Sequence, residues 1–381
     1  MKILSLFSNI GVAEAYLHEI GFEVAVANEL VERRADLFSK IYPNATMVRG
    51  DIQAPEIFSS ILRESRKKKI DLILATPPCQ GMSRAAGIPK EGDERNDLVI
   101  PTFKLVRELR PKYVFIENVK RFLEIKIRYC KKFYKIPALI KELLGQEYNI
   151  KIELIDTKDF GVPQTRKRVI ALMTRKDIKG TWEIPPKDGE LVTLEQSIGD
   201  LPSIDPYVTD FTEDELLDLF PSYFDKKKKG KLVSEWHTPP KHIGRQVITM
   251  AHTETGKTAF DNKFYFPKKK DGSRVNGFKS TYRRLRWEAP ASTVTMDNRK
   301  ISSQNNVHPG RFIGKDQKGN KLYSDPRALT LYEIMRITTI PDDWPVPKET
   351  SEAFLRSVIG EGIPPLFVRK VFETIGNQDH K

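Results

Sequence analysis

The sequence predicts an α/β protein built on a doubly wound parallel sheet, followed by a smaller, loop-rich region. Short apolar runs alternate with amphipathic helical stretches, the former at residues 2–7, 24–27, 72–75 and 114–116 and the latter at 31–41 and 98–109. This alternation is typical of repeated strand–helix–strand units. After about residue 175 the chain becomes rich in proline, lysine and aromatic residues and loses clean helical periods. Short strands and long loops are expected there.

The runs in the first part are apolar throughout, as expected for strands buried on both faces of a parallel sheet. A further strand is expected at residues 46–48, and helical periodicity returns at 329–336 and 366–375. Sheets of this kind bind ligands beyond the carboxyl ends of their strands. The residues directly after each run are therefore the first candidates for a functional site.

The composition excludes several classes of protein. The chain has 381 residues, 39% hydrophobic and 30% charged, so it can bury a sizeable core and is not disordered as a whole. No apolar run approaches the roughly 20 residues that span a bilayer, and the first residues read as a strand, not a signal peptide. Two cysteines cannot form a disulfide framework. The six histidines show no metal-ligand spacing, so we expect no metal and no membrane association.

The charge is concentrated in one segment. The formal net charge is +13, and residues 226–300 alone hold 19 basic and 6 acidic residues, so the remainder is neutral. A neutral body with one basic segment favours a polyanionic partner, most simply nucleic acid. A solvated, lysine-rich surface is the alternative on charge alone.

Three successive strand ends carry groups that suit a nucleoside-containing cofactor. The turn Ser8-Asn9-Ile10-Gly11 exposes backbone N–H groups to an anionic ligand, without the G-x-G-x-x-G spacing of a dinucleotide site. Glu29, about 20 residues later, can accept both ribose hydroxyls. Asp51 can accept from an adenine amino group, with Ile52 against the ring. Taken singly, each is equally explained as an ordinary turn or a helix cap.

Cys79 is the sharpest single feature of the sequence. It follows an apolar strand and the pair Pro77-Pro78, which cannot continue a sheet ladder and so places the thiol at the sheet's edge. Residues 81–96 are small and polar and suit a loop over a site. Cys130 lies among lysines and arginines in a helical pattern, and we interpret it as incidental.

Two further segments complete the candidate site. Glu117 follows the strand at 114–116 and should face the same crevice, where a carboxyl group can donate to a ring nitrogen. Gln164, Arg166 and Arg168 alternate, so in an extended segment they point to one face. A solvated basic turn is the plain alternative, but near a cysteine and a glutamate a site for a flipped base or a phosphate is favoured.

These blocks, in this order, resemble the signature motifs of the cytosine carbon-5 DNA methyltransferases. The specific ones are Pro77-Pro78-Cys79-Gln80, Glu117-Asn118-Val119 and Gln164-Thr165-Arg166-Lys167-Arg168. Residues 326–341 and 360–365 resemble the late blocks, so the resemblance covers nearly the whole chain. The chain departs from the usual pattern in the first block, at Ser8, Asn9 and Val12, and in the last, where Glu361 replaces an asparagine.

The resemblance implies a Rossmann-like S-adenosylmethionine-dependent methyltransferase sheet with a smaller, loop-rich target-recognition domain. The implied domains are a catalytic domain at 1–178, a basic recognition domain at 179–325 and a segment at 326–381 that returns to the catalytic domain. The implied cofactor is S-adenosylmethionine, with S-adenosylhomocysteine as product. Its expected contacts are Phe7, Ser8, Asn9, Ile10, Gly11, Glu29, Leu30, Asp51, Ile52, Pro77 and Leu98.

The chemistry requires such a catalytic set. Carbon 5 of cytosine is a weak nucleophile until a thiolate adds at carbon 6, and the resemblance assigns this covalent role to Cys79. Glu117 is expected to hold or protonate N3 and Arg168 to bind O2, with Arg166 steadying the arrangement. The target base must be flipped out of its duplex.

The DNA contacts are expected on both sides of the flipped base. Gln80, Ser83 and Arg84 lie in the loop that closes over the base, and Gln164 lies beside it. Arg283, Arg284 and Arg299 lie in the basic segment, where phosphate contacts outnumber base contacts. His308, beside Pro309-Gly310, is interpreted as structural.

The sequence thus predicts a sequence-specific methyltransferase of double-stranded DNA from a restriction–modification system. It is expected to be a cytoplasmic monomer, with a cognate restriction endonuclease encoded nearby as a possible partner. Two alternatives stay open: a tRNA cytosine-5 methyltransferase, whose Cys-Phe-Thr signature this recognition region lacks, and a catalytically idle DNA-binding module. A nicotinamide dehydrogenase is disfavoured by the missing glycine spacing.

Overall fold

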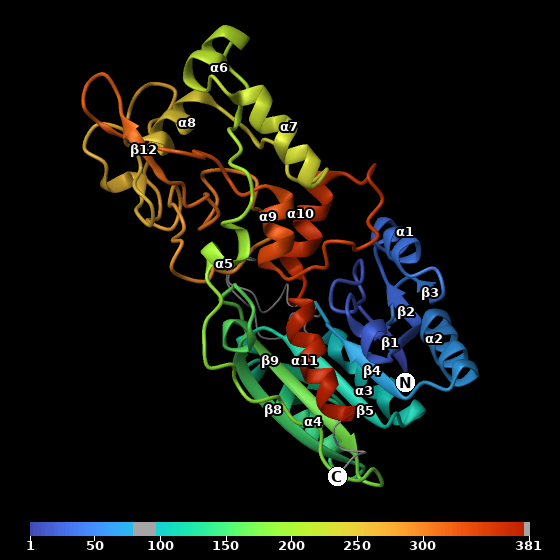
Figure 1. Ribbon diagram of the computed structural model, residues 1–381. Helices are drawn as coiled ribbons and strands as arrows, with labels where there is room; N and C mark the ends of the chain where they lie inside the picture. The colour runs from blue at the N-terminus through green and yellow to red at the C-terminus, as the bar shows by residue number, and fades with distance from the viewer. Residues whose placement is uncertain (79–96, 377–381) are drawn as a thin grey trace.

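A seven-stranded mixed sheet forms the centre of the computed structural model, which describes residues 1–78 and 97–376 (Figure 1). Its strand order is β3-β2-β1-β4-β5-β9-β8. The five strands from β3 to β5 are parallel, and β9 runs antiparallel to both β5 and β8. The strands are β1 (Lys2–Leu6), β2 (Glu23–Glu29), β3 (Thr46–Arg49), β4 (Leu72–Ala75), β5 (Tyr113–Asn118), β8 (Tyr148–Asp156) and β9 (Lys167–Arg175).

Helices cover both faces of this sheet. On one face, α2 (Pro55–Lys68), α3 (Val99–Leu109) and α4 (Ile136–Leu144) contribute to one apolar cluster with the strands. On the other face, α11 (Pro365–Gly376) packs through Phe367 and Phe372 against the sheet and against Trp182. Figure 1 shows α11 crossing in front of β9 and β5. Residues from the C-terminal helix therefore pack in the same apolar cluster as residues from the first strand.

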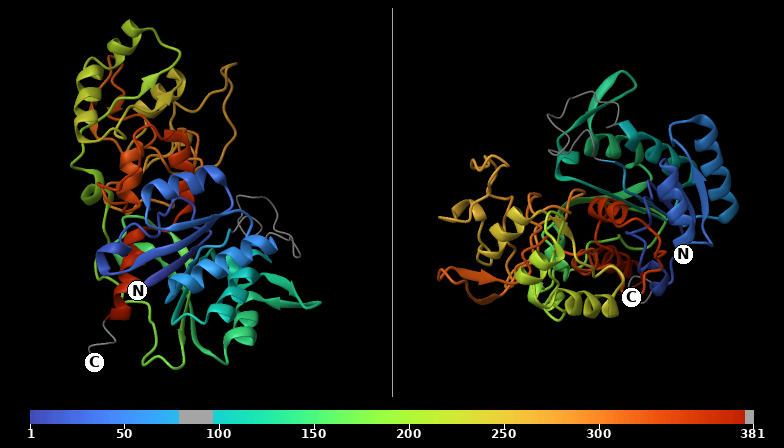
Figure 2. Two further views of the ribbon diagram at one scale, coloured as in Figure 1. Left: turned by 90° about the vertical axis from the view of Figure 1, so that its right-hand side faces the viewer. Right: turned by 90° about the horizontal axis from the view of Figure 1, so that it is seen from above.

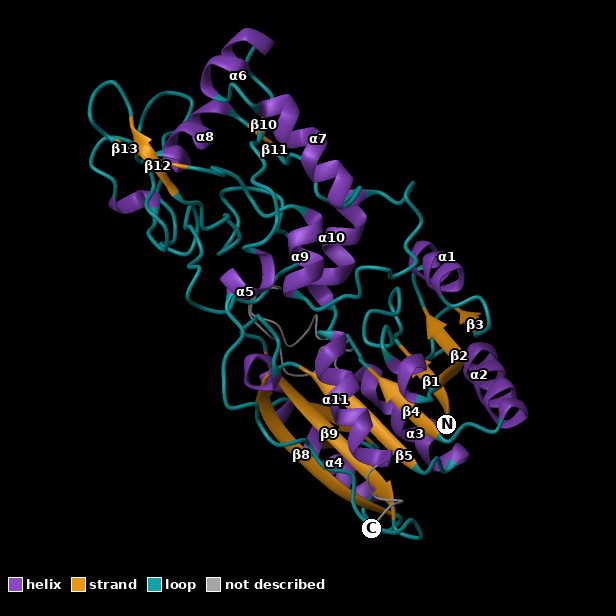
Figure 3. Cartoon of the chain, in the orientation of Figure 1, coloured by secondary structure: helices purple, strands orange, loops and turns teal. Residues whose placement is uncertain are grey.

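The remaining elements are short and widely spaced, as the composition after residue 175 indicates. Figure 3 shows this part of the molecule as mostly loop. A third cluster, which includes α9 and α10, joins it to residues of the first turn and of α1. Helix α1 spans Glu32–Ile41. The elements of the loop-rich part are α5 (Leu194–Ile198), β10 (Tyr207–Val208), α6 (Glu213–Leu219), α7 (Tyr223–Val233), β11 (Lys241–His242), α8 (Gly244–Ala251), β12 (Phe312–Lys315), β13 (Lys321–Tyr323), α9 (Leu331–Ile337) and α10 (Glu352–Glu361).

The predicted α/β class is confirmed, and the strands and helices expected from the sequence are present within a residue or a few of their expected bounds. Two expectations were wrong. The sheet is mixed instead of wholly parallel, because β8 and β9 add an antiparallel pair at one edge. The helical pattern around Cys130 is a hairpin of β6 (Lys126–Tyr129) and β7 (Lys132–Lys135), because the alternation of Ile127, Tyr129 and Tyr134 with charged residues has the period of a strand.

Candidate active site

The carboxyl ends of the parallel strands bring the predicted site residues to one edge of the sheet. The register pairs Leu6 of β1 with Asn28 of β2 and with Ala75 of β4, and Ala75 with Ile116 of β5. The residues at these strand ends therefore lie side by side; they include Phe7, Glu29, Thr76 and Glu117. Hydrogen bonds tie the ends together: the Thr76 hydroxyl donates to the Phe7 carbonyl over 3.1 Å.

The first turn is an unusual stretch of backbone. Phe7, Asn9 and Gly11 all have positive φ, at 56°, 50° and 85°, which only glycine adopts without cost. A Cβ at Gly11 would lie 2.0 Å from the Tyr42 ring, so the turn packs tightly on α1's end. Ser8 and Ile10 are buried, and the Ser8 hydroxyl donates to the Asn28 carbonyl.

Glu29 closes this turn from the neighbouring strand. Its two carboxylate oxygens each accept one backbone N–H, from Asn9 and from Val31, both over 2.9 Å. These bonds fix the carboxylate at the end of β2. Leu30 and Val31 beside it are exposed, with Leu30 at 65%. An acidic group beside an uncovered apolar surface is what a ribose with its base requires.

The other expected cofactor contacts lie along the same edge. Ile52 is buried after β3, and the exposed Asp51 accepts the N–H of Gln53 over 2.9 Å. Pro77 is buried beyond β4, and Leu98 is half-buried at the start of α3. Asn9 Oδ1 is buried and has no hydrogen-bond partner among the described residues. The acceptor and apolar groups present therefore fit an adenosine-bearing cofactor.

Glu117 and Arg168 form the centre of the site. They come from adjacent antiparallel strands, β5 and β9, and Arg168 Nε lies 2.6 Å from Glu117 Oε1. Their side chains are only 10% and 13% exposed. A carboxyl and a guanidinium held side by side match N3 and O2 of cytosine, which are neighbouring atoms of its Watson–Crick edge.

The strand end that leads to the predicted nucleophile is fixed to the same place. Asn118, next to Glu117, donates from Nδ2 to the Pro77 carbonyl over 3.0 Å and accepts the Val119 N–H. Cys79, two residues beyond Pro77, lies outside the described residues, as do Gln80, Ser83 and Arg84.

Gln164, Arg166 and Arg168 do not share one function, in contrast to the expectation from their alternation. Arg166 is buried and donates to the carbonyls of Val294, Gly360 and Glu361 over 2.9–3.0 Å. Gln164 is fully buried and accepts the Val294 N–H. The predicted DNA contact by Gln164 is therefore wrong. Both side chains join β9 to distant parts of the chain, and only Arg168 faces the site.

The three arginines predicted to contact DNA differ in exposure. Arg284 is 1% exposed and donates to the carbonyls of Met250, His308 and Asp325. Its predicted DNA contact is wrong, because its guanidinium is buried and its hydrogen bonds are made to backbone carbonyls inside the protein. Burial lowers the pKa of this guanidinium to about 9. Arg283 is half-buried and Arg299 exposed. His308 is buried and accepts the Gly310 N–H at Nδ1, a structural contact.

A polar network beside the first turn was missed by the sequence analysis. Arg34 of α1 pairs with Glu361 over 2.8 Å, and Asn9 Nδ2 donates to Glu361 and to the Val358 carbonyl. Two of the departures from the family pattern, Asn9 and Glu361, thus contact each other. The only signal in the sequence was that both positions depart. Nearby, the buried Glu14 accepts from the Ser5 hydroxyl, and burial raises its pKa to about 7.

Across residues 1–78 and 97–376, no group of three or more histidine, cysteine or acidic side chains is placed to hold a metal ion. In the same part of the chain, no helix is long and apolar enough to cross a membrane.

The fold and the arrangement at its carboxyl edge are those of a Rossmann-like methyltransferase. A model of the C-5 cytosine-specific DNA methylases matches residues 1–377, and the chain belongs to this family. It is 39% identical over 382 residues to the Type II methyltransferase M1.HgaI of Avibacterium volantium, covering 99% of this chain and 98% of that one. It is 26% identical to the Type II methyltransferase M.FnuDI of Fusobacterium nucleatum, covering 100% and 96%.

Two solved structures share the fold over the full length. One is a DNA modification methyltransferase encoded within an E. coli prophage, with a TM-score of 0.67, 21% identity and complete coverage of both chains. The other is a mutant of DNMT2 from Spodoptera frugiperda, with a TM-score of 0.60, 16% identity and coverage of 98% and 99%. At these identities the likeness concerns the fold alone.

Proposed function

We propose that this protein methylates carbon 5 of a flipped cytosine in double-stranded DNA, within a Type II restriction–modification system. One observation carries the catalytic part of the proposal: the enclosed Glu117–Arg168 pair at the edge of the sheet, beside the strand end that leads to Cys79. Membership of the C-5 cytosine-specific DNA methylases supports the reaction. The Type II methyltransferases to which the chain is similar along its length support the context.

S-adenosylmethionine is the cofactor of the proposed reaction, and bound at this edge it supplies the methyl group. Glu29 would hold the ribose hydroxyls, and Asp51 the adenine amino group. Leu30, Ile52 and Leu98 offer apolar surface to the ring. At the first turn, the buried Asn9 Oδ1, which has no partner among the described residues, would accept a hydrogen bond from the remaining polar end. Glu361 is tied to Asn9 and Arg34 at this end and so positions the turn. We propose that no metal takes part.

The proposed steps on the base follow from the residues present. The Cys79 thiolate adds to carbon 6, and Glu117, hydrogen-bonded at N3, with Arg168 at O2, stabilises the charge that moves into the ring. Carbon 5 then accepts the methyl group. Loss of the carbon-5 proton to a base and expulsion of the Cys79 thiolate restore the double bond. Arg166 contacts no base in this scheme and acts as a positioning residue for Arg168's strand.

The expected setting follows from the DNA substrate. A protective methyltransferase must reach the host chromosome, so we place it in the cytoplasm of a bacterial or phage-infected cell, with a cognate endonuclease encoded nearby. A monomer is proposed, because a single copy carries both the catalytic edge and the loop-rich part. The tRNA alternative gains no support from the likeness to DNMT2, which concerns the fold alone.

The proposal is tested by expressing the chain in a host that lacks cytosine-5 methylation and sequencing the host DNA after bisulfite treatment. Protected cytosines in one short sequence context are expected. The Cys79→Ala variant should give none, and Glu117→Gln should reduce turnover by about 10²–10⁴-fold, the usual contribution of a positioned proton donor.

Two controls separate the alternatives. Arg299→Gln retains the catalytic set, so protection in the same context should persist at a lower rate. DNA binding by Cys79→Ala is expected to match the wild type. A folded wild-type protein that binds DNA without methylating it would favour the idle module, and methylation found only in RNA would favour the tRNA branch.

A further inference from the structure

The hairpin of β6 and β7 is the most basic surface segment outside residues 226–300. Five of its ten residues, 126–135, are lysine or arginine and none is acidic. It begins eight residues after Asn118, the last residue of β5. The left view of Figure 2 shows it projecting from the sheet-bearing part of the molecule at the lower right.

The two faces of the hairpin differ sharply. Ile127 is 1% exposed, and with the half-buried Tyr129 and Tyr134 it packs on the core of the sheet. The register places Lys126 opposite Lys135 and Arg128 opposite Phe133 on the other face. All four of these residues are exposed, and Phe133 is 58% exposed. We call Lys126, Arg128, Phe133 and Lys135 the outer face.

Among the residues that the structure describes, the charges of the outer face have no compensating partner. Like charges directly opposite each other on paired strands are destabilising, and Lys126 faces Lys135. Within residues 1–78 and 97–376, no ion pair involves any of the hairpin's cations. By contrast, Lys151 on β8 pairs with Glu153 and Glu183, so other strands of this protein do neutralise their lysines. An external polyanion would supply the missing charge.

The hairpin is also fixed relative to the active site. Its turn residues Cys130 and Lys131 have φ of 46° and 66°, the two left-handed residues of a tight two-residue turn. The chain between β5 and β6 is anchored by Phe122 and Ile125, which are 1% and 3% exposed. The outer face therefore keeps a constant position with respect to Glu117, which a surface that guides a substrate to the site must do.

We propose that the outer face binds the sugar–phosphate backbone of the DNA duplex that carries the target cytosine. Lys126, Arg128 and Lys135 contact phosphates, and Phe133 packs against the apolar edge of a deoxyribose. This proposal rests on the proposed function, because it takes the substrate to be duplex DNA. It adds a contact from the sheet-bearing part to those expected from Arg283 and Arg299 of the basic segment, so that the duplex is held on two sides.

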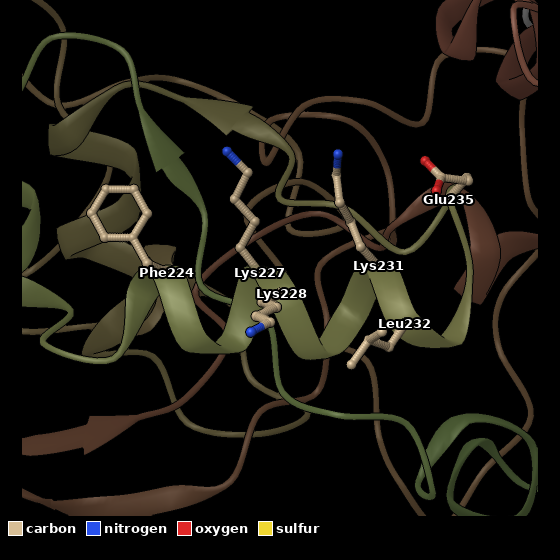
Figure 4. A pocket seen from close by; sticks show the side chains of 6 residues that line it. All are labelled: Phe224, Lys227, Lys228, Lys231, Leu232 and Glu235. Atoms are coloured by element: carbon tan, nitrogen blue, oxygen red, sulfur yellow. The ribbon is translucent and has the colours of Figure 1, made fainter.

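A second lysine-rich surface provides a matched control. Along α7, the exposed Phe224 is followed by Lys227, Lys228 and Lys231, which with Glu235 line a surface hollow of about 430 Å³ (Figure 4). It resembles the outer face in charge and in having an exposed phenylalanine. Both views of Figure 2 place α7 and the hairpin at opposite sides of the molecule. A duplex bound to one is not in place to contact the other.

The test compares two triple variants of the full chain. One carries Lys126→Gln, Arg128→Gln and Lys135→Gln, and the other carries Lys227→Gln, Lys228→Gln and Lys231→Gln. Binding to a 30-base-pair duplex is measured without cofactor over a range of salt concentrations. The hairpin variant should bind about 10–100-fold more weakly, and the slope of log K against log salt should fall by about 2–3, since each lost phosphate contact removes about 0.9. The α7 variant should stay within about threefold of the wild type.

Each outcome decides the question. Equal weakening by both variants would show that only net charge matters, and wild-type affinity in the hairpin variant would show no contact; either result overturns the proposal. Thermal unfolding of both triple variants shows whether weaker binding comes from lost contacts or from a misfolded hairpin. Phe133→Ser preserves the charges of the outer face and is expected to bind DNA about threefold more weakly. A wild type that binds DNA through the hairpin but never methylates it would overturn the proposed function alone.

Discussion

The central sheet packs against its helices through large apolar clusters, whereas the loop-rich part encloses a cluster of buried charges. On the face of the sheet that α11 covers, Phe372 of α11 lies with its ring centre 5.2 Å from those of both Phe22 and Trp182. In the loop-rich part, Arg327 is fully buried between Asp325 and Glu333, at 2.9 and 2.8 Å. The two regions are thus held together by different kinds of contact.

The buried charges connect segments that are distant in the chain. Asp325 accepts from Ser203 and from the Ile204 N–H, and Arg284 donates to carbonyls of three separate segments. Here few regular strands are present to satisfy the backbone, so side chains do so. Buried ion pairs are costly to form but specify one arrangement when every group is bonded. We infer that this cluster fixes the shape of the loop-rich part more than it adds to its stability.

The largest effect is expected from breaking the cluster at its centre. Arg327→Leu leaves two buried carboxylates without their cation, which should lower the free energy of unfolding by about 3–5 kcal/mol or more. Urea unfolding measures this loss. Arg311→Leu is the matched control, because its pair with Glu195 is about half exposed and should cost less than about 1 kcal/mol. If the two variants lost equal free energies of unfolding, the conclusion that the buried ion pairs matter more than the exposed one would be wrong.

A comparable but purely apolar loss is expected in the sheet. Phe372→Ala removes a fully buried ring from the cluster that holds α11 and should cost about 3–5 kcal/mol. The loss should be independent of salt and of pH between 5 and 8, unlike any loss in the charged cluster. Phe372→Leu should recover most of the stability. Strong pH dependence of the Phe372→Ala loss would blur the distinction between the two regions.

A smaller effect is expected on acidification, and it should concern the loop-rich part. Burial lowers the pKa of His308 to about 4 and that of His242 to about 3. Both accept backbone N–H groups at a ring nitrogen, so both are neutral in the folded state. In the unfolded chain they bind protons near pH 6.5. The contribution of these two histidines to the free energy of unfolding is therefore full above pH 6.5 and falls below it, by on the order of 1–2 kcal/mol per histidine at pH 5, whereas Glu14, whose pKa burial raises to about 7, acts in the opposite direction. Unfolding at pH 7 and pH 5, with His242→Gln for comparison, measures this term.

The catalytic edge was predictable because its parts are local. Apolar runs fix the parallel strands, and strand order of this type brings their carboxyl ends together, so Glu29, Asp51 and Glu117 could be placed on one edge before any coordinates. The arginines were harder. Arg168 meets Glu117 as expected, but Arg284 and Gln164 are buried, because the burial of a long polar side chain depends on distant carbonyls that no local pattern reveals.

The charge pattern misdirected attention in the same way. Counting charges along the chain singled out residues 226–300, yet α7 within that window lies far from the hairpin that follows the catalytic strand. The hairpin was hidden because its ten residues are few beside the neutral remainder. Its inward and outward residues alternate with the period of a strand, but the segment is rich in lysine and arginine and was interpreted from the sequence as helical.

By itself, the sequence determined the α/β class and the family to which the chain belongs, and it indicated the edge at which we propose the chemistry, because these depend on short-range periodicity and on residue types at strand ends. Only the tertiary structure decided which cations are available to a substrate. A charge is exposed or buried according to what packs against it, and those partners, such as Glu333 for Arg327 or Gly360 for Arg166, come from other parts of the chain.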